Sequence, residues 1–165
     1  MDEFFIFDNY VTGRSFAGRQ SDCMALGNLI SSHENVCLYA APKCGKTSLV
    51  HQALINLQNS GRNFTVPVFD MSGVRTVEAF TSGLIASVMA QVCDSPADFT
   101  SFMQEFLGGT AYEFDPAAYE DYGKTVMLRD RISPSDITAA LTLPYRVASE
   151  RSTDLVFVFD DFQNI

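Results

Sequence analysis

The sequence has little of what metal and disulfide sites need. Among its 165 residues tryptophan is absent, and histidine occurs only at His33 and His51. It contains no C-x-x-C pair, and neither histidine stands at metal-ligand spacing from the cysteines, which are Cys23, Cys37, Cys44 and Cys93. This pattern argues against a zinc site. We expect the cysteines to be reduced, structural thiols of a cytosolic protein.

Basic residues and long apolar runs are also few. The 11 Lys and Arg residues are outnumbered by 20 Asp and Glu residues, which gives a formal net charge of -9. Because such a surface repels phosphate backbones, nucleic acid is not indicated as a partner. No stretch approaches the roughly 20 apolar residues of a membrane span. The first ten residues begin with acids, whereas a signal peptide begins with basic residues. We expect a soluble, cytoplasmic protein.

Apolar bulk is what the sequence does have. Hydrophobic residues make up 47% of the chain, with 14 Phe and 6 Tyr among them, and charged residues only 19%. This composition argues against wholesale disorder. The length fits one globular domain, or part of one, with a single core.

Strand-like and helix-like segments alternate along the chain, which predicts an α/β layered fold. Apolar runs predict strands over 36–40, 64–70 and 155–159. The second should lie at a sheet edge, since Pro67 cannot donate to a ladder. Helical spacing predicts helices over 20–32, 47–60, 76–93, 99–107 and 133–151, and Pro144 should kink the last of them. Residues 108–130 give no clear prediction.

A candidate phosphate loop lies between the first predicted strand and the second predicted helix. Residues 40–47 fit G-x-x-x-x-G-K-[ST] except that Ala40 replaces the first glycine. Gly45 lets the backbone approach a polyphosphate, Lys46 can reach its β and γ phosphates, and Thr47 can offer a hydroxyl to magnesium. The expected phosphate-binding residues are Lys43, Cys44, Gly45, Lys46, Thr47 and Ser48. The alternative is a structural turn that happens to spell Gly-Lys-Thr.

A second motif ends the last predicted strand. Leu155 to Phe159 is fully apolar and is followed by Asp160 and Asp161. Asp160 suits magnesium, held with several waters, and Asp161 is then placed to activate an attacking water. The alternative is an ordinary acidic turn.

In these two motifs and in Phe16-Ala17-Gly18-Arg19, the chain resembles the STAND and AAA+ branches of P-loop ATPases, especially prokaryotic ATPases with F-x-G-R ahead of the phosphate loop. The resemblance implies a three-layer αβα sandwich with a mainly parallel sheet, ATP and Mg²⁺ as cofactors, and nucleotide contacts from Phe16, Gly18 and Arg19. Many hydrolysing relatives have Glu where this chain has Asp161.

The resemblance also implies a domain organisation. Residues 1–34 form an N-terminal segment and helix with the F-x-G-R motif, and residues 35–165 form the first part of the nucleotide-binding core. The chain ends four residues after Asp161, where family members continue, so we expect the core to be incomplete. In the family's strand order, the missing sensor strand lies between the phosphate-loop strand and the Asp160 strand.

The leading functional prediction is ATP binding and hydrolysis that drives or gates a conformational change, with Lys46 and Asp161 as catalytic residues and Thr47 and Asp160 as metal ligands. The alternatives are a nucleotide-binding signalling or scaffold switch with little turnover, and a phosphotransferase. The expected partners are ATP and an unidentified protein, with a homo-oligomer left open. At Cys44, a redox brake on ATP binding stands against a small, tolerated side chain.

Overall fold

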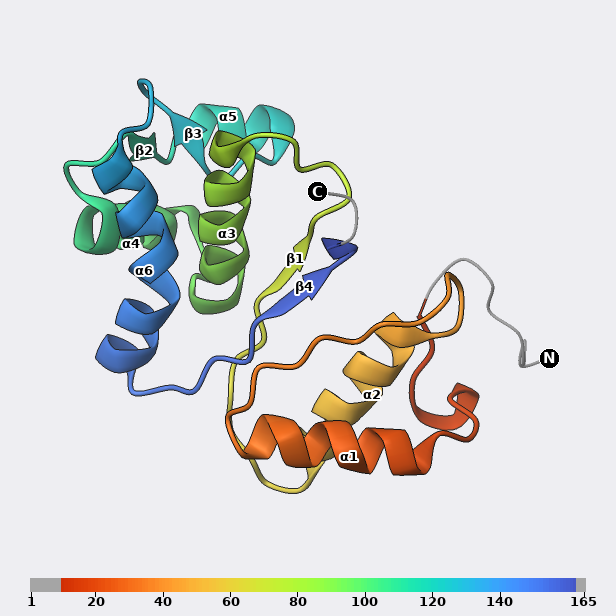
Figure 1. Ribbon diagram of the computed structural model, residues 1–165. Coiled ribbons are helices and arrows are strands. Elements are labelled where there is room, and N and C mark those ends of the chain that lie inside the picture. Colours follow the sequence, from red (N-terminus) through yellow and green to blue (C-terminus); the bar gives the residue numbers. More distant parts are fainter. Residues whose placement is uncertain (1–9, 163–165) are drawn as a thin grey trace. The chain divides into compact units, whose positions relative to one another are not determined.

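The computed structural model describes residues 10–162 and is a mixed α/β structure with a small parallel sheet (Figure 1). The chain divides into two compact units, Met1–Asn63 and Phe64–Ile165, each with its own apolar core. The α/β class is therefore confirmed, whereas the described residues do not form a complete three-layer sandwich. The two units are defined by their compactness, whereas the boundary predicted at residue 34 is based on sequence motifs.

Two helices and a short 3-10 turn make up the described part of the first unit. The elements are η1 (Gly13–Ser15), α1 (Gln20–Ser31) and α2 (Lys46–Asn59), and both predicted helices are confirmed. The two α-helices pack side by side (Figure 1). Their shared core contains Cys23, Leu26, Leu49 and Ala53. Burial of this apolar stripe is what holds the pair together.

The strand predicted over 36–40 is not found among the described residues. Its side chains are exposed instead, to 39% at Val36, 36% at Leu38 and 98% at Tyr39. The prediction was wrong for this structure because an apolar run forms a strand only where a neighbouring strand bonds its N–H and C=O groups. Within residues 10–162 no strand pairs with it.

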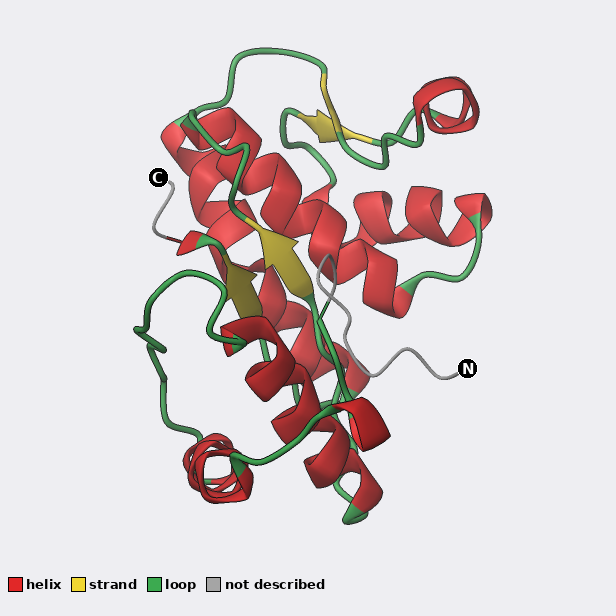
Figure 2. Cartoon of the chain, turned by 90° about the vertical axis from the view of Figure 1, so that its right-hand side faces the viewer, coloured by secondary structure: helices red, strands yellow, loops and turns green. Residues whose placement is uncertain are grey.

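The second unit contains a two-stranded parallel sheet, drawn in yellow at the centre of Figure 2. Strands β1 (Val68–Asp70) and β4 (Val158–Asp160) pair in register, and an isolated bridge joins Thr65 to Leu155. Pro67 supplies only its carbonyl, which accepts a 2.9 Å bond from the Val158 N–H. Both later strand predictions are confirmed, though the regular strands are shorter than predicted. The edge position of β1 agrees with Pro67, since β1 has a partner on one side only among the described strands.

Three long helices form the main core of the second unit. Helix α3 (Val77–Val92) begins at the Thr76 cap, α4 (Pro96–Leu107) at Ser95, and α6 (Pro134–Arg151) at a capping box between Ser133 and Asp136. The buried residues between them include Ile85, Met89, Phe102, Phe106, Leu143 and Val147. All three helix predictions are confirmed. Pro144 lies inside α6, and the residues on both sides of it remain helical.

The segment that gave no clear prediction forms a small hairpin-like insertion. Strands β2 (Tyr112–Glu113) and β3 (Met127–Leu128) pair antiparallel, and α5 (Pro116–Tyr122) lies between them in the sequence. A two-residue strand is too short to have a hydrophobic period, so no pattern could predict it. Of the helices within residues 10–162, none combines the length and the apolar character that a membrane crossing requires.

Gly83 is where α3 approaches β1 most closely. A Cβ added there would overlap the ring of Phe69, which is 7% exposed and packed among Met71, Val74 and Leu84. We predict that Gly83→Ala lowers the free energy of unfolding by about 1–3 kcal/mol, although alanine favours a helix by about 1 kcal/mol. Chemical denaturation measures this change. Gly73→Ala is the control, because a Cβ there has no neighbour within 4 Å. Equal stability of the two variants would contradict the packing argument.

Asp136 should make stability depend on pH. Hydrogen bonds from the backbone N–H and the hydroxyl of Ser133, and from the Ala111 N–H, hold the pKa of Asp136 below its usual value. A lowered folded-state pKa stabilises the fold above the unfolded value of about 3.9, and this stabilisation is lost as pH falls through the folded value. We therefore expect Asp136→Asn to flatten the loss of stability on acidification, as measured by urea unfolding at a series of pH values. The control is Asp121→Asn, at an exposed acid of α5, which should keep the wild-type profile. A wild-type profile in Asp136→Asn would refute this account.

Candidate functional site

The candidate phosphate loop leads directly into α2, and two of its residues have a left-handed backbone. Gly45 is the N-cap residue of α2 at φ 77°, and Lys43 has φ 59°, so two left-handed residues flank Cys44. Such an alternation turns successive N–H groups toward one concave side, which is the geometry of an anion-binding nest. Ala40 is not among the residues with positive φ. Its β-carbon is therefore accommodated where the motif usually has glycine.

The N–H groups of this loop are available to a ligand. Among residues 10–162, the backbone N–H groups of Lys43, Cys44, Gly45 and Lys46 donate no hydrogen bond. Lys43, Cys44 and Gly45 are exposed, so water can reach them. An oxyanion with several acceptor atoms can replace that water.

Lys46 folds back over its own loop. Its Nζ donates to the carbonyl oxygens of Ala40, at 3.1 Å, and Ala41, at 3.3 Å. The ammonium thereby joins the first two loop residues to the first residue of α2. These two carbonyls hold the ammonium against the start of the loop. The expected role of Lys46 on phosphates requires only a local change of acceptors.

Ser48 differs from its neighbours in the motif, because its hydroxyl is already engaged. It is buried and accepts a 3.0 Å bond from the Val11 N–H. Two residues further along the chain, the Gly13 N–H donates to Gln52 Oε1 at 2.6 Å. These two bonds hold residues 11–13 against α2. The hydroxyl of Ser48 therefore holds this segment in place. The expected contact of Ser48 with phosphate would then come from its backbone N–H group.

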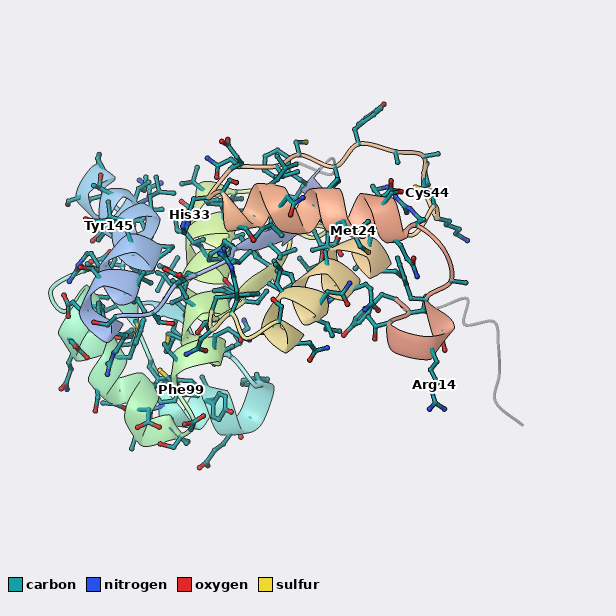
Figure 3. The ribbon with its side chains drawn as sticks, turned by 90° about the horizontal axis from the view of Figure 1, so that it is seen from below. Arg14, Met24, His33, Cys44, Phe99 and Tyr145 are labelled. Carbon is teal, nitrogen blue, oxygen red and sulfur yellow. The ribbon has the colours of Figure 1, made fainter. Side chains whose placement is uncertain are left out.

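The F-x-G-R segment divides between the core and the loop. Phe16 is half-buried and packs on the α1 and α2 core, and Gly18 needs its φ of 74°, which favours glycine. Arg19 reaches the phosphate loop: its Nη1 donates to Cys44 O at 3.0 Å, and its Nε donates to Asp22 Oδ2 at 2.9 Å. In Figure 3, Cys44 accordingly lies near the N-terminal end of α1, with His33 at the other end.

The predicted carboxylates lie at the end of β4. Asp160 is half-buried and is the last residue of the strand, and Asp161 is exposed with φ 55°. The Asp161 N–H donates to Asp160 Oδ1 at 3.0 Å. The left-handed residue Asp161 therefore follows the strand directly, and the next residue, Phe162, places its ring 6.5 Å from that of Phe159.

Sequence reasoning missed a third carboxylate at this edge. Asp70 ends β1 and is the register partner of Asp160, and carboxyl ends of parallel strands meet at one edge of a sheet. The Ser72 N–H donates to Asp70 Oδ1 at 2.8 Å, and this backbone bond holds the pKa of Asp70 below its usual value. The signal was present in the sequence, because Val-Phe-Asp ends both strands. Within residues 10–162 no group of three or more His, Cys, Asp or Glu residues is arranged to hold a metal ion.

The predicted site residues fall in different units. The phosphate loop, Thr47 and Arg19 belong to the first unit, and Asp160 and Asp161 belong to the second. The structure brings Arg19 to the loop and Asp70 to Asp160. Each of these two contacts lies within a single unit.

The left-handed backbone at Lys43 generates a prediction about the loop. We expect Lys43→Val to be less stable than Lys43→Gly by about 1–2 kcal/mol, because a β-branched residue is strained at φ 59° and glycine is not. Both variants remove the ammonium, so their difference in urea unfolding reports the backbone alone. Equal stabilities would mean that Lys43 does not hold this conformation in solution.

Comparison with known proteins found no matching family model, no matching curated protein and no matching solved structure.

Proposed function

We propose that the chain binds ATP with Mg²⁺ at its phosphate loop and forms part of a P-loop ATPase of the STAND or AAA+ type. The observation that carries this proposal is the start of α2. There a folded-back loop presents four N–H groups without hydrogen bonds among the described residues, beside the Lys46 ammonium. The complete three-layer sandwich of that family, and a cytoplasmic setting rich in ATP, belong to the same proposal.

The charge at the start of α2 favours a polyphosphate as the ligand. Gly45 provides no side-chain cap, and the first turn of α2 contains no acid. The partial positive charge of the helix N-terminus is therefore not neutralised by a cap or an acid of its own. A ligand with several negatively charged oxygens can satisfy the N–H groups and take the Lys46 ammonium from the Ala40 and Ala41 carbonyls.

The metal part of the proposal rests on residue chemistry. Magnesium takes oxygen ligands and keeps several waters, so the Thr47 hydroxyl and one Asp160 carboxylate are sufficient protein contacts. When bound, the ion neutralises charge on the phosphates.

A nucleotide-dependent switch with little turnover is the second candidate. Asp161 favours it, because its carboxylate is one methylene shorter than the glutamate of many hydrolysing relatives. Under this alternative the nucleotide would gate contact with a protein partner or with another copy of the chain.

Thermal or chemical unfolding with Mg-ATP tests the proposed binding. Ligand at one hundred times its dissociation constant should raise the free energy of unfolding of the full chain by about 2.7 kcal/mol. Lys46→Ala should remove most of this gain, because the ammonium has no replacement in the loop. Lys124→Ala is the matched control, since Lys124 is exposed and lies outside the candidate site. The proposal is wrong if Mg-ATP adds nothing to the wild-type chain, or if Lys46→Ala keeps the full gain.

Phosphate release under the same conditions separates the two candidates. Release above the Lys46→Ala background supports the ATPase and excludes a switch without turnover. Bound ATP that remains intact supports the switch.

A further inference from the structure

We propose that Arg19 is a positioning residue that holds the Cys44–Gly45 peptide so that the Gly45 N–H faces the phosphate. This inference rests on the proposed ATP site and adds a residue that acts through the loop backbone. The resemblance to the ATPase family implies instead that Arg19 contacts the nucleotide itself.

The guanidinium of Arg19 is fixed from two sides. Nε donates to Asp22 Oδ2 at 2.9 Å, and Nη1 donates to Cys44 O at 3.0 Å. A β-carbon built on Gly45 would lie 3.8 Å from the same Nη1. Because the guanidinium is a planar fork, two acceptors on different atoms set both its position and its plane. The acid of α1 therefore aims Arg19 at one peptide of the loop.

Because of the geometry of the peptide bond, the contact with the Cys44 carbonyl also sets the direction of the Gly45 N–H group. All peptide bonds of the described chain are trans, so the Cys44 carbonyl and the Gly45 N–H point in opposite directions. A donor that holds the carbonyl on one side directs the N–H to the other side. That N–H donates no hydrogen bond among the described residues. Arg19 therefore lies on the outer side of the peptide whose inner side is open to an anion.

The backbone on both sides of the contact agrees with a positioning role. Arg19 itself has φ 54° and ψ 27° as the N-cap of α1, and Lys43 and Gly45 are left-handed on either side of Cys44. Non-glycine residues in this region are strained, and surrounding contacts must maintain them. The bond from Nη1 to Cys44 O joins these two left-handed segments. Its charge also polarises the peptide, which strengthens Gly45 as a donor.

Two polyphosphate probes distinguish positioning from direct contact with the nucleotide. We expect Arg19→Ala to weaken binding of Mg-ATP and of inorganic tripolyphosphate by the same factor, on the order of tenfold. Tripolyphosphate has no base or ribose, so a residue that contacts those groups would affect ATP alone. Isothermal titration with the full chain measures both affinities. The matched control is Arg14→Ala on η1, an exposed arginine outside the loop, which should leave both affinities unchanged (Figure 3).

The ligand-free protein gives a second, independent readout. In ¹H–¹⁵N spectra, the Gly45 amide signal should shift in Arg19→Ala, stay in place in Arg14→Ala, and return part of the way in Arg19→Lys, which keeps a cationic donor. Arg19→Lys also serves if Arg19→Ala fails to fold. An unchanged Gly45 signal in the folded variants, or a loss of affinity for ATP without one for tripolyphosphate, overturns the inference. If the wild-type chain binds neither probe, the proposed function fails with the binding step of the inference. The response of Gly45 to Arg19 still decides whether the arginine sets the loop backbone.

Discussion

The unsatisfied start of α2 is the constraint on which the candidate site depends. Every helix leaves its first N–H groups without partners inside the helix, and most helices of this chain satisfy them with a side chain. The capping residues of α3, α4, α5 and α6 are Thr76, Ser95, Asp115 and Ser133. Helix α1 has no such cap but has Asp22 in its first turn. Among the described α-helices, α2 alone has neither a capping side chain nor an acid in its first turn. The partial positive charge at its start is therefore not neutralised by its own residues.

Local signals in the sequence were sufficient to predict five of the described α-helices, all except α5. Apolar residues at helical spacing located α1 and α2, and the Ser133-Pro134 start located α6, because caps and periodicity are properties of neighbouring residues. The strand over 36–40 failed for the opposite reason. A strand depends on a partner that is distant in the sequence, and no apolar pattern specifies whether that partner is present. The insertion with β2 and β3 could not be predicted because each strand has only two residues.

The same distinction divides the candidate site. The turn at Gly45 before α2 follows from a short motif, whereas the predicted contact of Lys46 with phosphates stays a prediction. The bond between Arg19 and Cys44 joins residues 25 positions apart, and the pairing of Asp70 with Asp160 depends on strand register. Neither contact has a local signature. Both change what the residues do, since Arg19 acts on the loop backbone and Asp160 has a second carboxylate beside it at the sheet edge.

Backbone strain distinguishes the motif residues from the rest of the chain. Five non-glycine residues among those described have positive φ: Arg19, His33, Lys43, Ser152 and Asp161. His33 follows α1 and Ser152 is the C-cap of α6, so ordinary helix termination accounts for both. The other three lie in the three sequence motifs: Arg19 is the N-cap residue of α1, Lys43 stands two residues before the N-cap of α2, and Asp161 follows β4. Arginine and lysine gain less from a left-handed conformation than asparagine or aspartate do. Their strain must therefore be maintained by contacts such as the one between Arg19 and Cys44.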